Sequence, residues 1–154
     1  MENQTIPDFE LPGTGGLTFR PADFRGRALV LYFYPKDNTP GCTVEGQDFR
    51  DCHAEFQALG CEVFGISRDG IKSHEGFKAK LGLSFELLSD ADETACELFA
   101  VIKMKNMYGK KVRGIERSTF LIGRDGRVVL EWRGVKVPDH VHEVLEAVRS
   151  LPTP

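Results

Sequence analysis

The sequence lacks the features that mark a membrane, secreted or nucleic-acid-binding protein. No apolar run approaches the roughly 20 residues that a membrane-spanning helix needs. Residues 1–13 are acidic and contain neither the positive nor the apolar region of a secretory signal. A net charge of -3 with interspersed signs gives no basic face for a phosphate backbone. We therefore expect a cytoplasmic protein with no membrane and no nucleic acid among its partners.

The sequence also lacks cysteine and histidine at the spacing of a zinc site. The cysteines stand at positions 42, 52, 61 and 96 without a CxxC pair, and only four histidines accompany them. His140 and His142 are two residues apart and point to different helix faces, so we expect surface residues rather than joint ligands. We expect no metal and no cofactor. In a reducing cytosol the cysteines should be core residues or reactive thiols rather than disulfides.

The length and the apolar patterning predict a single domain of alternating strands and helices. The 154 residues suffice for one domain with a layered core and are too few for two ordinary domains. Short apolar runs indicate strands, and apolar residues three or four apart indicate helices. The expected strands span residues 28–34, 62–67, 85–88, 118–122 and 127–132. The expected helices span residues 43–59, 71–81, about 89–99 and a segment that begins at 138–139.

These elements predict an α/β protein with a central mixed β-sheet flanked by helices, the thioredoxin-like arrangement, over residues 1–154. The strand at 28–34 is apolar throughout and should be buried on both faces. The last two strands are joined through Asp125-Gly126, a strong hairpin signal. Residues 103–114 are polar, and we expect a long loop there.

Cys42 is the residue whose position most favours chemistry. It follows the strand at 28–34 and a turn at 37–41, and it stands in the first turn of the next helix. Ligands of open α/β sheets bind beyond the carboxyl ends of the strands. Unpaired amide N–H groups and the helix dipole at this end stabilise a thiolate, the nucleophilic form of cysteine. A small buried hydrophobe would not need a Pro-Gly turn to deliver it, so we predict a reactive thiol.

The segment YFYPKDNTPGCTVE, which ends at Glu45, resembles the active-site segment of peroxiredoxins, specifically of the PrxQ or bacterioferritin comigratory protein (BCP) subfamily. The resemblance covers nearly the whole chain, from residues 7–9 to the last helix. It implies a thioredoxin-like fold and a thiol-dependent peroxidase. Such an enzyme reduces hydrogen peroxide and organic hydroperoxides through a sulfenic acid on Cys42.

The resemblance also implies roles for four further residues. Thr39 would give a hydroxyl hydrogen bond to the peroxide, beside the backbone N–H of Cys42. Arg117 would hold both the thiolate and the substrate oxygens with its cationic fork. Pro35 would shield the thiolate from water, and Glu45, on the same helix face as Cys42, would orient Arg117. Each residue also has an ordinary structural explanation, so the prediction depends on their joint spacing.

The sequence departs from the PrxQ pattern at the step that regenerates the thiol. Many members carry a second cysteine five residues after the reactive one, where this chain has Gln47, and others carry it in the next helix, which here has none. We therefore expect a one-cysteine cycle, in which an external thiol reduces the sulfenic acid. That thiol would be glutathione with glutaredoxin, or thioredoxin. The alternative is a two-cysteine cycle in which local unfolding brings Cys96 near.

The other thiols are expected to be core residues. Cys52 lies about 15 Å along the same helix from Cys42, beyond the Cα separation of about 7 Å that a disulfide tolerates. Cys61 begins an inner strand, and Cys96 shares a helix face with Phe99, so both indicate small buried hydrophobes.

Two other functions remain open at this point. A thiol-disulfide oxidoreductase would need a partner thiol where Thr39 stands. A peroxide sensor without turnover would stop after about one equivalent of peroxide. The basic segment at residues 103–113 is either a solvated loop or a surface that steers an acidic reductant toward the site. We expect a monomer rather than a dimer.

Overall fold

The computed structural model describes residues 1–152 and contains a five-stranded sheet with the strand order β5-β4-β3-β8-β9. The strands are β3 (Ala28–Phe33), β4 (Cys61–Ser67), β5 (Leu87–Ser89), β8 (Ser118–Ile122) and β9 (Val128–Arg133). Strands β3, β4 and β5 are parallel, whereas β8 pairs antiparallel with both β3 and β9. The helices are α1 (Pro40–Ala58), α2 (Ile71–Leu81), α3 (Thr94–Leu98) and α4 (His140–Arg149). This mixed sheet between helices confirms the predicted architecture.

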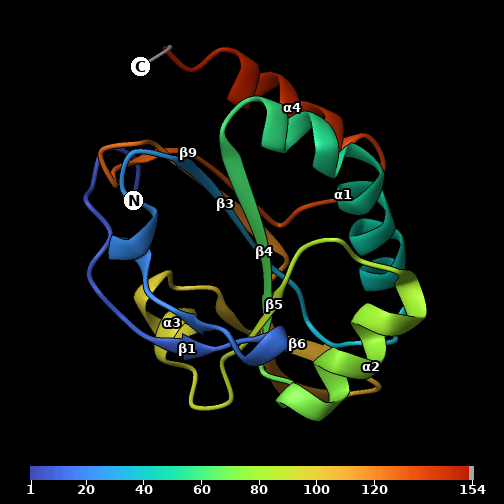
Figure 1. The fold of residues 1–154 in the computed structure, drawn as a ribbon. Helices are drawn as coiled ribbons and strands as arrows, with labels where there is room; N and C mark the ends of the chain where they lie inside the picture. The colour runs from blue at the N-terminus through green and yellow to red at the C-terminus, as the bar shows by residue number, and fades with distance from the viewer. Residues whose placement is uncertain (153–154) are drawn as a thin grey trace.

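Helices cover both faces of the sheet (Figure 1). Helices α1, α2 and α4 lie on one face, and α3 lies on the other with the N-terminal segment. On β3, Val30 and Tyr32 point into the core under α1 and α4, which we call the α1-side core. Leu29 and Leu31 point into the opposite core, the α3-side core. All four are buried, which confirms the expectation that this strand is covered on both faces.

The N-terminal segment adds two short strands to the α3-side face. Strands β1 (Leu11–Pro12) and β2 (Thr18–Phe19) pair antiparallel, and single turns of 3₁₀ helix lie at Thr14–Gly16 and Pro21–Phe24. Phe19 is fully buried and anchors this segment in the α3-side core. No helix within residues 1–152 is both long and apolar enough to cross a membrane.

Proline and glycine set the ends of the two longer helices that follow the parallel strands. Helix α1 begins at Pro40, three residues before the expected start, because proline fits a first helical turn that needs no N–H donor. It ends just before Gly60, and α2 ends before Gly82, with φ values of 70° and 64°. This left-handed conformation suits glycine, which confirms both expected stops.

The segment expected to be a helix over about 89–99 is helical only over α3, because Ser89 belongs to β5 and a turn follows it. Glu93 adopts a left-handed conformation with φ of 60°, so α3 has only five residues. The Asp90 carboxylate accepts hydrogen bonds from the amides of Ala95 and Cys96 at 3.1 and 2.7 Å. Asp90 therefore caps α3 from outside instead of belonging to its first turn.

The expected loop at residues 103–114 is wrong, because the segment forms a hairpin of β6 (Ile102–Met107) and β7 (Lys110–Ile115). Tyr108 and Gly109 between the strands have φ values of 52° and 79°, as a two-residue hairpin turn requires. The hairpin is a separate two-stranded sheet, and most of its side chains are exposed. A hairpin exposed on both faces needs no apolar alternation, which is why its pattern resembles that of a loop.

Candidate active site

Cys42 lies in the first turn of α1, directly beyond the carboxyl end of β3. Thr39 precedes the helix with extended backbone, and Pro40 occupies the first helical position. The first backbone hydrogen bond of the helix runs from Thr43 N–H to the Thr39 carbonyl at 2.9 Å. The amides of Gly41 and Cys42 precede that bond, so they lie outside the helical ladder and can face an anion. This placement of the Cys42 thiol confirms the predicted helix N-terminus.

Arg117 joins Cys42 to Glu45 although the two cross-links span more than 70 positions of sequence. Its Nη2 donates to the Cys42 sulfur at 3.4 Å and its Nη1 donates to Glu45 Oε1 at 2.6 Å. Arg117 comes from the residue before β8, the strand that pairs with β3. A Cβ on Gly41 would lie 3.0 Å from Arg117 Nη2, so glycine there lets the guanidinium approach. The structure thus brings together three of the five predicted site residues.

The carboxylate of Glu45 is fully buried, and this dominates its electrostatics. Only its Oε1 is hydrogen-bonded, whereas Oε2 has no partner among residues 1–152. Burial raises the pKa of Glu45 to about 7, because it outweighs the opposing attraction of Arg117. The same ion pair, with the Cys42 thiol, raises the pKa of Arg117 despite its own burial. Glu45 therefore holds Arg117 at a cost in desolvation, as buried ion pairs commonly do.

Thr39 and Pro35 belong to the loop that connects β3 to α1. The Thr39 hydroxyl donates to the Lys36 carbonyl at 2.8 Å and makes no cap bond to α1. Its oxygen lone pairs therefore remain able to accept a hydrogen bond. Pro35 is partly exposed and lines one wall of a surface pocket.

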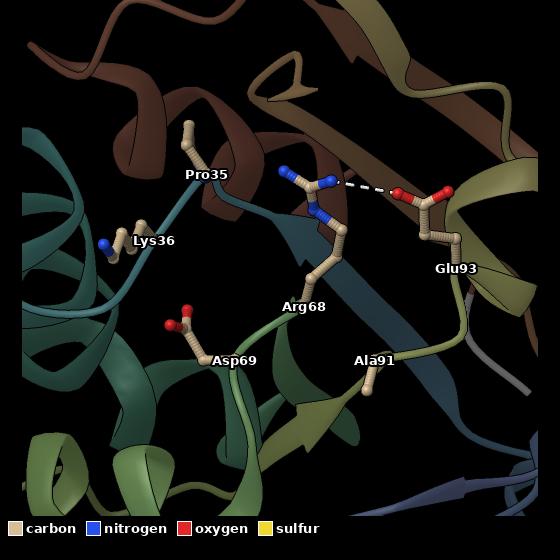
Figure 2. Close-up of a pocket in the computed structure, with 6 residues that line it drawn as sticks. All are labelled: Pro35, Lys36, Arg68, Asp69, Ala91 and Glu93. Atoms are coloured by element: carbon tan, nitrogen blue, oxygen red, sulfur yellow. Dashed lines mark hydrogen bonds and ion pairs between the residues drawn. The ribbon is translucent and has the colours of Figure 1, made fainter. Parts of the chain in front are cut away.

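That pocket lies where the carboxyl ends of three parallel strands meet. Figure 2 shows its six lining residues. They are Pro35 and Lys36 after β3, Arg68 and Asp69 after β4, and Ala91 and Glu93 after β5. The pocket has a volume of about 410 Å³, and Arg68 spans it to Glu93 at 2.9 Å. Strand-end placement of this kind is where ligands of α/β sheets bind.

All four cysteines are free and buried, and they divide between the two faces of the sheet. Cys42, Cys52 and Cys61 belong to the α1-side core, whereas Cys96 belongs to the α3-side core. The burial confirms the expected core positions of Cys52, Cys61 and Cys96. Burial raises the pKa of Cys61 to about 12, and burial with Asp90 raises that of Cys96 further.

The expectation that His140 lies on the surface is wrong. Its side chain is buried, hydrogen-bonded through Nε2 to Thr119 at 2.8 Å, and packed edge-on against Trp132. Burial and the nearby Arg117 charge lower the pKa of His140 to about 4, so the imidazole is neutral at pH 7. His142 is exposed, as expected. A position in the first turn of an amphipathic helix does not distinguish a histidine that faces the sheet from one that faces solvent.

Sequence reasoning also missed a buried polar cluster beneath the β3–α1 loop. Asp37, Asp69 and His74 place one side-chain nitrogen or oxygen each within 4.8 Å of one another. Asp37 lies in the segment YFYPKDNTPGCTVE, but the sequence does not show which side chains it contacts, so it indicated only a turn. His74 is a lone histidine on the buried face of α2, which usually signals a core residue.

The AhpC/TSA family model matches residues 3–130. The chain belongs to this family. Peroxiredoxin Bcp of Xanthomonas campestris is 52% identical over 143 residues, covering 93% of this chain and 89% of the relative. Peroxiredoxin Bcp of Bacillus subtilis is 49% identical over 148 residues, covering 96% and 94%. The solved structure of a Xylella fastidiosa PrxQ mutant has a TM-score of 0.93 and 45% identity, covering 97% and 96%.

These relatives confirm the resemblance to PrxQ/BCP peroxiredoxins. A solved structure of the Xanthomonas campestris bacterioferritin comigratory protein matches with a TM-score of 0.88 and 51% identity, over 92% of this chain and 90% of that one. The fold is therefore the thioredoxin fold of peroxiredoxins, and the enzyme is a thiol-dependent peroxidase.

Proposed function

We propose that Cys42 is the thiol of this peroxiredoxin that attacks the peroxide. The observation that carries the proposal is the Arg117 guanidinium, which lies 3.4 Å from the Cys42 sulfur and is anchored on Glu45. A fixed cation beside a sulfur favours the thiolate, the nucleophilic form. The thiolate sulfur bonds to the terminal oxygen of ROOH, the O–O bond breaks, and RO⁻ leaves to take up a proton. Cys42 becomes a sulfenic acid and the peroxide becomes an alcohol or water.

Charge on the departing oxygen calls for convergent donors. The Cys42 amide and Arg117 supply N–H groups, and Pro35 keeps water from the sulfur. Because the Thr39 hydrogen is donated to the Lys36 carbonyl, we assign Thr39 the part of accepting the peroxide hydrogen rather than donating to it. Hydrogen peroxide and organic hydroperoxides both carry that hydrogen. The alkyl peroxide reduction activity described for the Xanthomonas campestris relative supports the organic class.

For the second half-reaction we propose a one-cysteine cycle. An external thiol attacks the sulfenic sulfur and releases water, and a second thiol then attacks the mixed disulfide to restore Cys42. The placement of Cys96 in the α3-side core supports this, because the sheet itself lies between Cys96 and the α1-side core that holds Cys42. Cys52 lies on the same intact helix, ten positions further, which is about 15 Å at 1.5 Å per residue.

The external thiol, glutathione with glutaredoxin or thioredoxin, would approach through the pocket beside Pro35 (Figure 2). Lys36 and Arg68 offer cations there to the carboxylates of glutathione or of an acidic protein surface. Arg113 of the basic hairpin is ion-paired with Glu93 on the pocket wall, so the hairpin adjoins the pocket. Lys36→Glu should slow the thiol-dependent step about tenfold at low salt and leave the peroxide step unchanged, whereas Lys80→Glu on α2 should change neither.

The decisive experiment compares four single cysteine-to-serine variants in a peroxide-consumption assay with added thiol. Cys42→Ser should lose turnover, and the variants at 52, 61 and 96 should keep it. Mass spectrometry of the peroxide-treated protein should show one added oxygen, or a mixed disulfide when thiol is present. An intramolecular disulfide that includes Cys96 would replace the one-cysteine cycle by the two-cysteine one.

The same assay separates an enzyme from a sensor, because a sensor would stop after about one equivalent of peroxide with reductant still present. We also propose that the protein works in the cytoplasm, since four free thiols suit a reducing compartment. Sedimentation would test the expected monomer.

A further inference from the structure

A charged cluster is buried beneath the loop that carries Pro35 and Thr39. His74 of α2 is fully buried, and its Nδ1 lies 2.8 Å from Asp37 Oδ2. Its Nε2 lies 2.9 Å from the backbone carbonyl of Leu88 on β5. The Asp37 side chain is 1% exposed, so the contact is dry on both sides. An ionic contact in this position is expensive and therefore calls for an explanation beyond packing.

Both hydrogen-bond partners of the His74 ring are acceptors. The Leu88 carbonyl can only accept, so Nε2 carries a hydrogen. Burial opposes ionisation of Asp37, but hydrogen bonds from His74, Tyr34 and Ser73 outweigh it and lower the pKa of this carboxyl group. The His74 ring therefore links the ionised Asp37 carboxylate to the backbone of β5.

The titratable groups that face His74 are Asp37 from the loop, Tyr34 from the end of β3 and Asp69 from the turn after β4. Strand β5 contributes only the carbonyl of Leu88.

Asp37 is the midpoint of the loop between Pro35 and Thr39, and it is held from several sides. Its Oδ1 accepts from the Tyr34 hydroxyl at 2.6 Å, and its Oδ2 accepts from Ser73 at 2.8 Å. Its amide donates to Asp69 Oδ2 at 2.9 Å. The next residue, Asn38, has a left-handed φ of 64°, which the surroundings must enforce. The path of the loop to the helix start therefore depends on this one carboxylate.

We propose that His74 is a positioning residue for peroxide reduction, whose ring holds Asp37 and thereby sets the place of Pro35 and Thr39 around the Cys42 sulfur. The inference rests on the proposed role of Cys42. His74 lies below the loop on another helix and touches no reacting atom, so it acts through Asp37 alone. Replacing either member should displace the loop and slow oxidation of Cys42 without unfolding the protein.

The test measures the second-order rate constant of the reduced protein with hydrogen peroxide by stopped-flow, together with thermal unfolding. Asp37→Asn and His74→Gln should each lower the rate constant by about tenfold to 100-fold, the size expected for a displacement of about 1 Å. The double variant should be no slower than the slower single variant, because the two residues act as one unit. His53→Gln is the matched control, since His53 is also buried and hydrogen-bonded, to Ser84 at 2.7 Å.

A purely structural role predicts a different outcome. The folded variants would then keep the wild-type rate constant, or the two effects would multiply in the double variant, and either result overturns the proposal. The thiol-dependent step adds a second readout, because His74→Gln should slow oxidation of Cys42 and leave the reduction of its sulfenic acid by added thiol unchanged. If His74→Gln fails to fold, Ser73→Ala provides a second test, because it removes one hydrogen-bond donor to Asp37. It should slow peroxide reduction about threefold, in keeping with the loss of one ordinary hydrogen bond. An unchanged rate constant would overturn the proposal.

Cys42→Ser keeps this result separate from the proposed function. Activity retained in Cys42→Ser would refute the role of Cys42. An inactive Cys42→Ser beside fully active Asp37→Asn and His74→Gln would refute only the positioning role.

Discussion

Replacing Glu45 with glutamine should separate the stability of the fold from the speed of peroxide reduction. Glutamine has nearly the same shape and keeps an oxygen that can accept the 2.6 Å hydrogen bond from Arg117. It removes a negative charge that is fully buried. Arg117 then has a weaker anchor beside the Cys42 sulfur. We expect the rate constant with peroxide to fall by about tenfold to 100-fold, because small displacements of a reacting group have effects of that size.

The effect on stability should have the opposite sign. Burial raises the pKa of Glu45 from its ordinary value of 4.5 to about 7. At about 1.4 kcal/mol for each tenfold change, this corresponds to about 3 kcal/mol that the ionised form costs the folded state. Glutamine resembles the protonated form and avoids that cost. This value already includes the attraction to Arg117. The buried amide group of the glutamine, with no partner at the position of Oε2, opposes the gain, so about 3 kcal/mol is the upper limit.

The pH dependence follows from proton linkage. In the unfolded chain Glu45 loses its proton near pH 4.5, whereas in the folded protein it keeps the proton to about pH 7. The folded state therefore binds more protons in this window, and its stability falls as the pH rises from about 4.5 to about 7. Glu45→Gln has no such proton, so the stability of the variant relative to the wild type should increase across the same window and then level off.

Urea denaturation between pH 4.5 and 8 measures the expected change in stability, and stopped-flow kinetics at each pH measures the expected change in the rate constant with peroxide. Glu55→Gln is the matched control, because Glu55 lies on the same helix but is exposed and paired with Arg149. The control should change neither measurement by more than about the 1 kcal/mol of a surface pair. A Glu45→Gln protein that is less stable at pH 8, or that reduces peroxide at the wild-type rate, would refute the reasoning.

Three further predictions concern other parts of the molecule. Gly65→Ala should destabilise the protein by about 1–3 kcal/mol in urea denaturation, because its Cβ would lie 2.7 Å from the Tyr32 ring, whereas Gly76→Ala, with open space around it, should be neutral or stabilising. The pKa of His140 is lowered from 6.5 to about 4, so on acidification the unfolded chain takes up this proton before the folded protein does, and the free energy of unfolding falls between about pH 6.5 and pH 4. His140→Gln should remove that loss in urea denaturation. An unchanged fall in the free energy of unfolding over this pH range would contradict the prediction. Thr39→Val should lower the peroxide rate constant by about 100-fold, the effect of removing one hydrogen-bonding group from a transition state, while Thr39→Ser retains most of it in the same stopped-flow assay.

The sequence predicts those parts of the fold and site that depend on local order. The apolar run before Pro35, the proline at the start of α1 and the glycines after α1 and α2 are local signals, and they place Cys42 at a helix N-terminus. The hairpin at Asp125-Gly126 is correct for the same reason. The fold class follows from the order of these elements.

What the sequence could not predict depends on side chains from distant elements. The raised pKa of Glu45 results from burial under neighbouring elements, and the position of His74 depends on two oxygens from separate segments. The hairpin of β6 and β7 was missed because exposed strands carry no apolar alternation. His140 was misplaced because its partner, Thr119, lies on β8, a distant part of the sequence.

The division of the cysteines between the two faces of the sheet has a consequence for oxidative damage. The five-stranded sheet separates Cys96 from the core that holds Cys42. In the proposed one-cysteine cycle, oxidation of Cys42 is reversed by incoming thiols. Cys96 on the other side is fully buried, and its raised pKa favours the weakly nucleophilic protonated form, so the proposed cycle does not use it. Oxidation of Cys96 in protein recovered from stressed cells would therefore record that the molecule had opened, and not how much peroxide it had consumed.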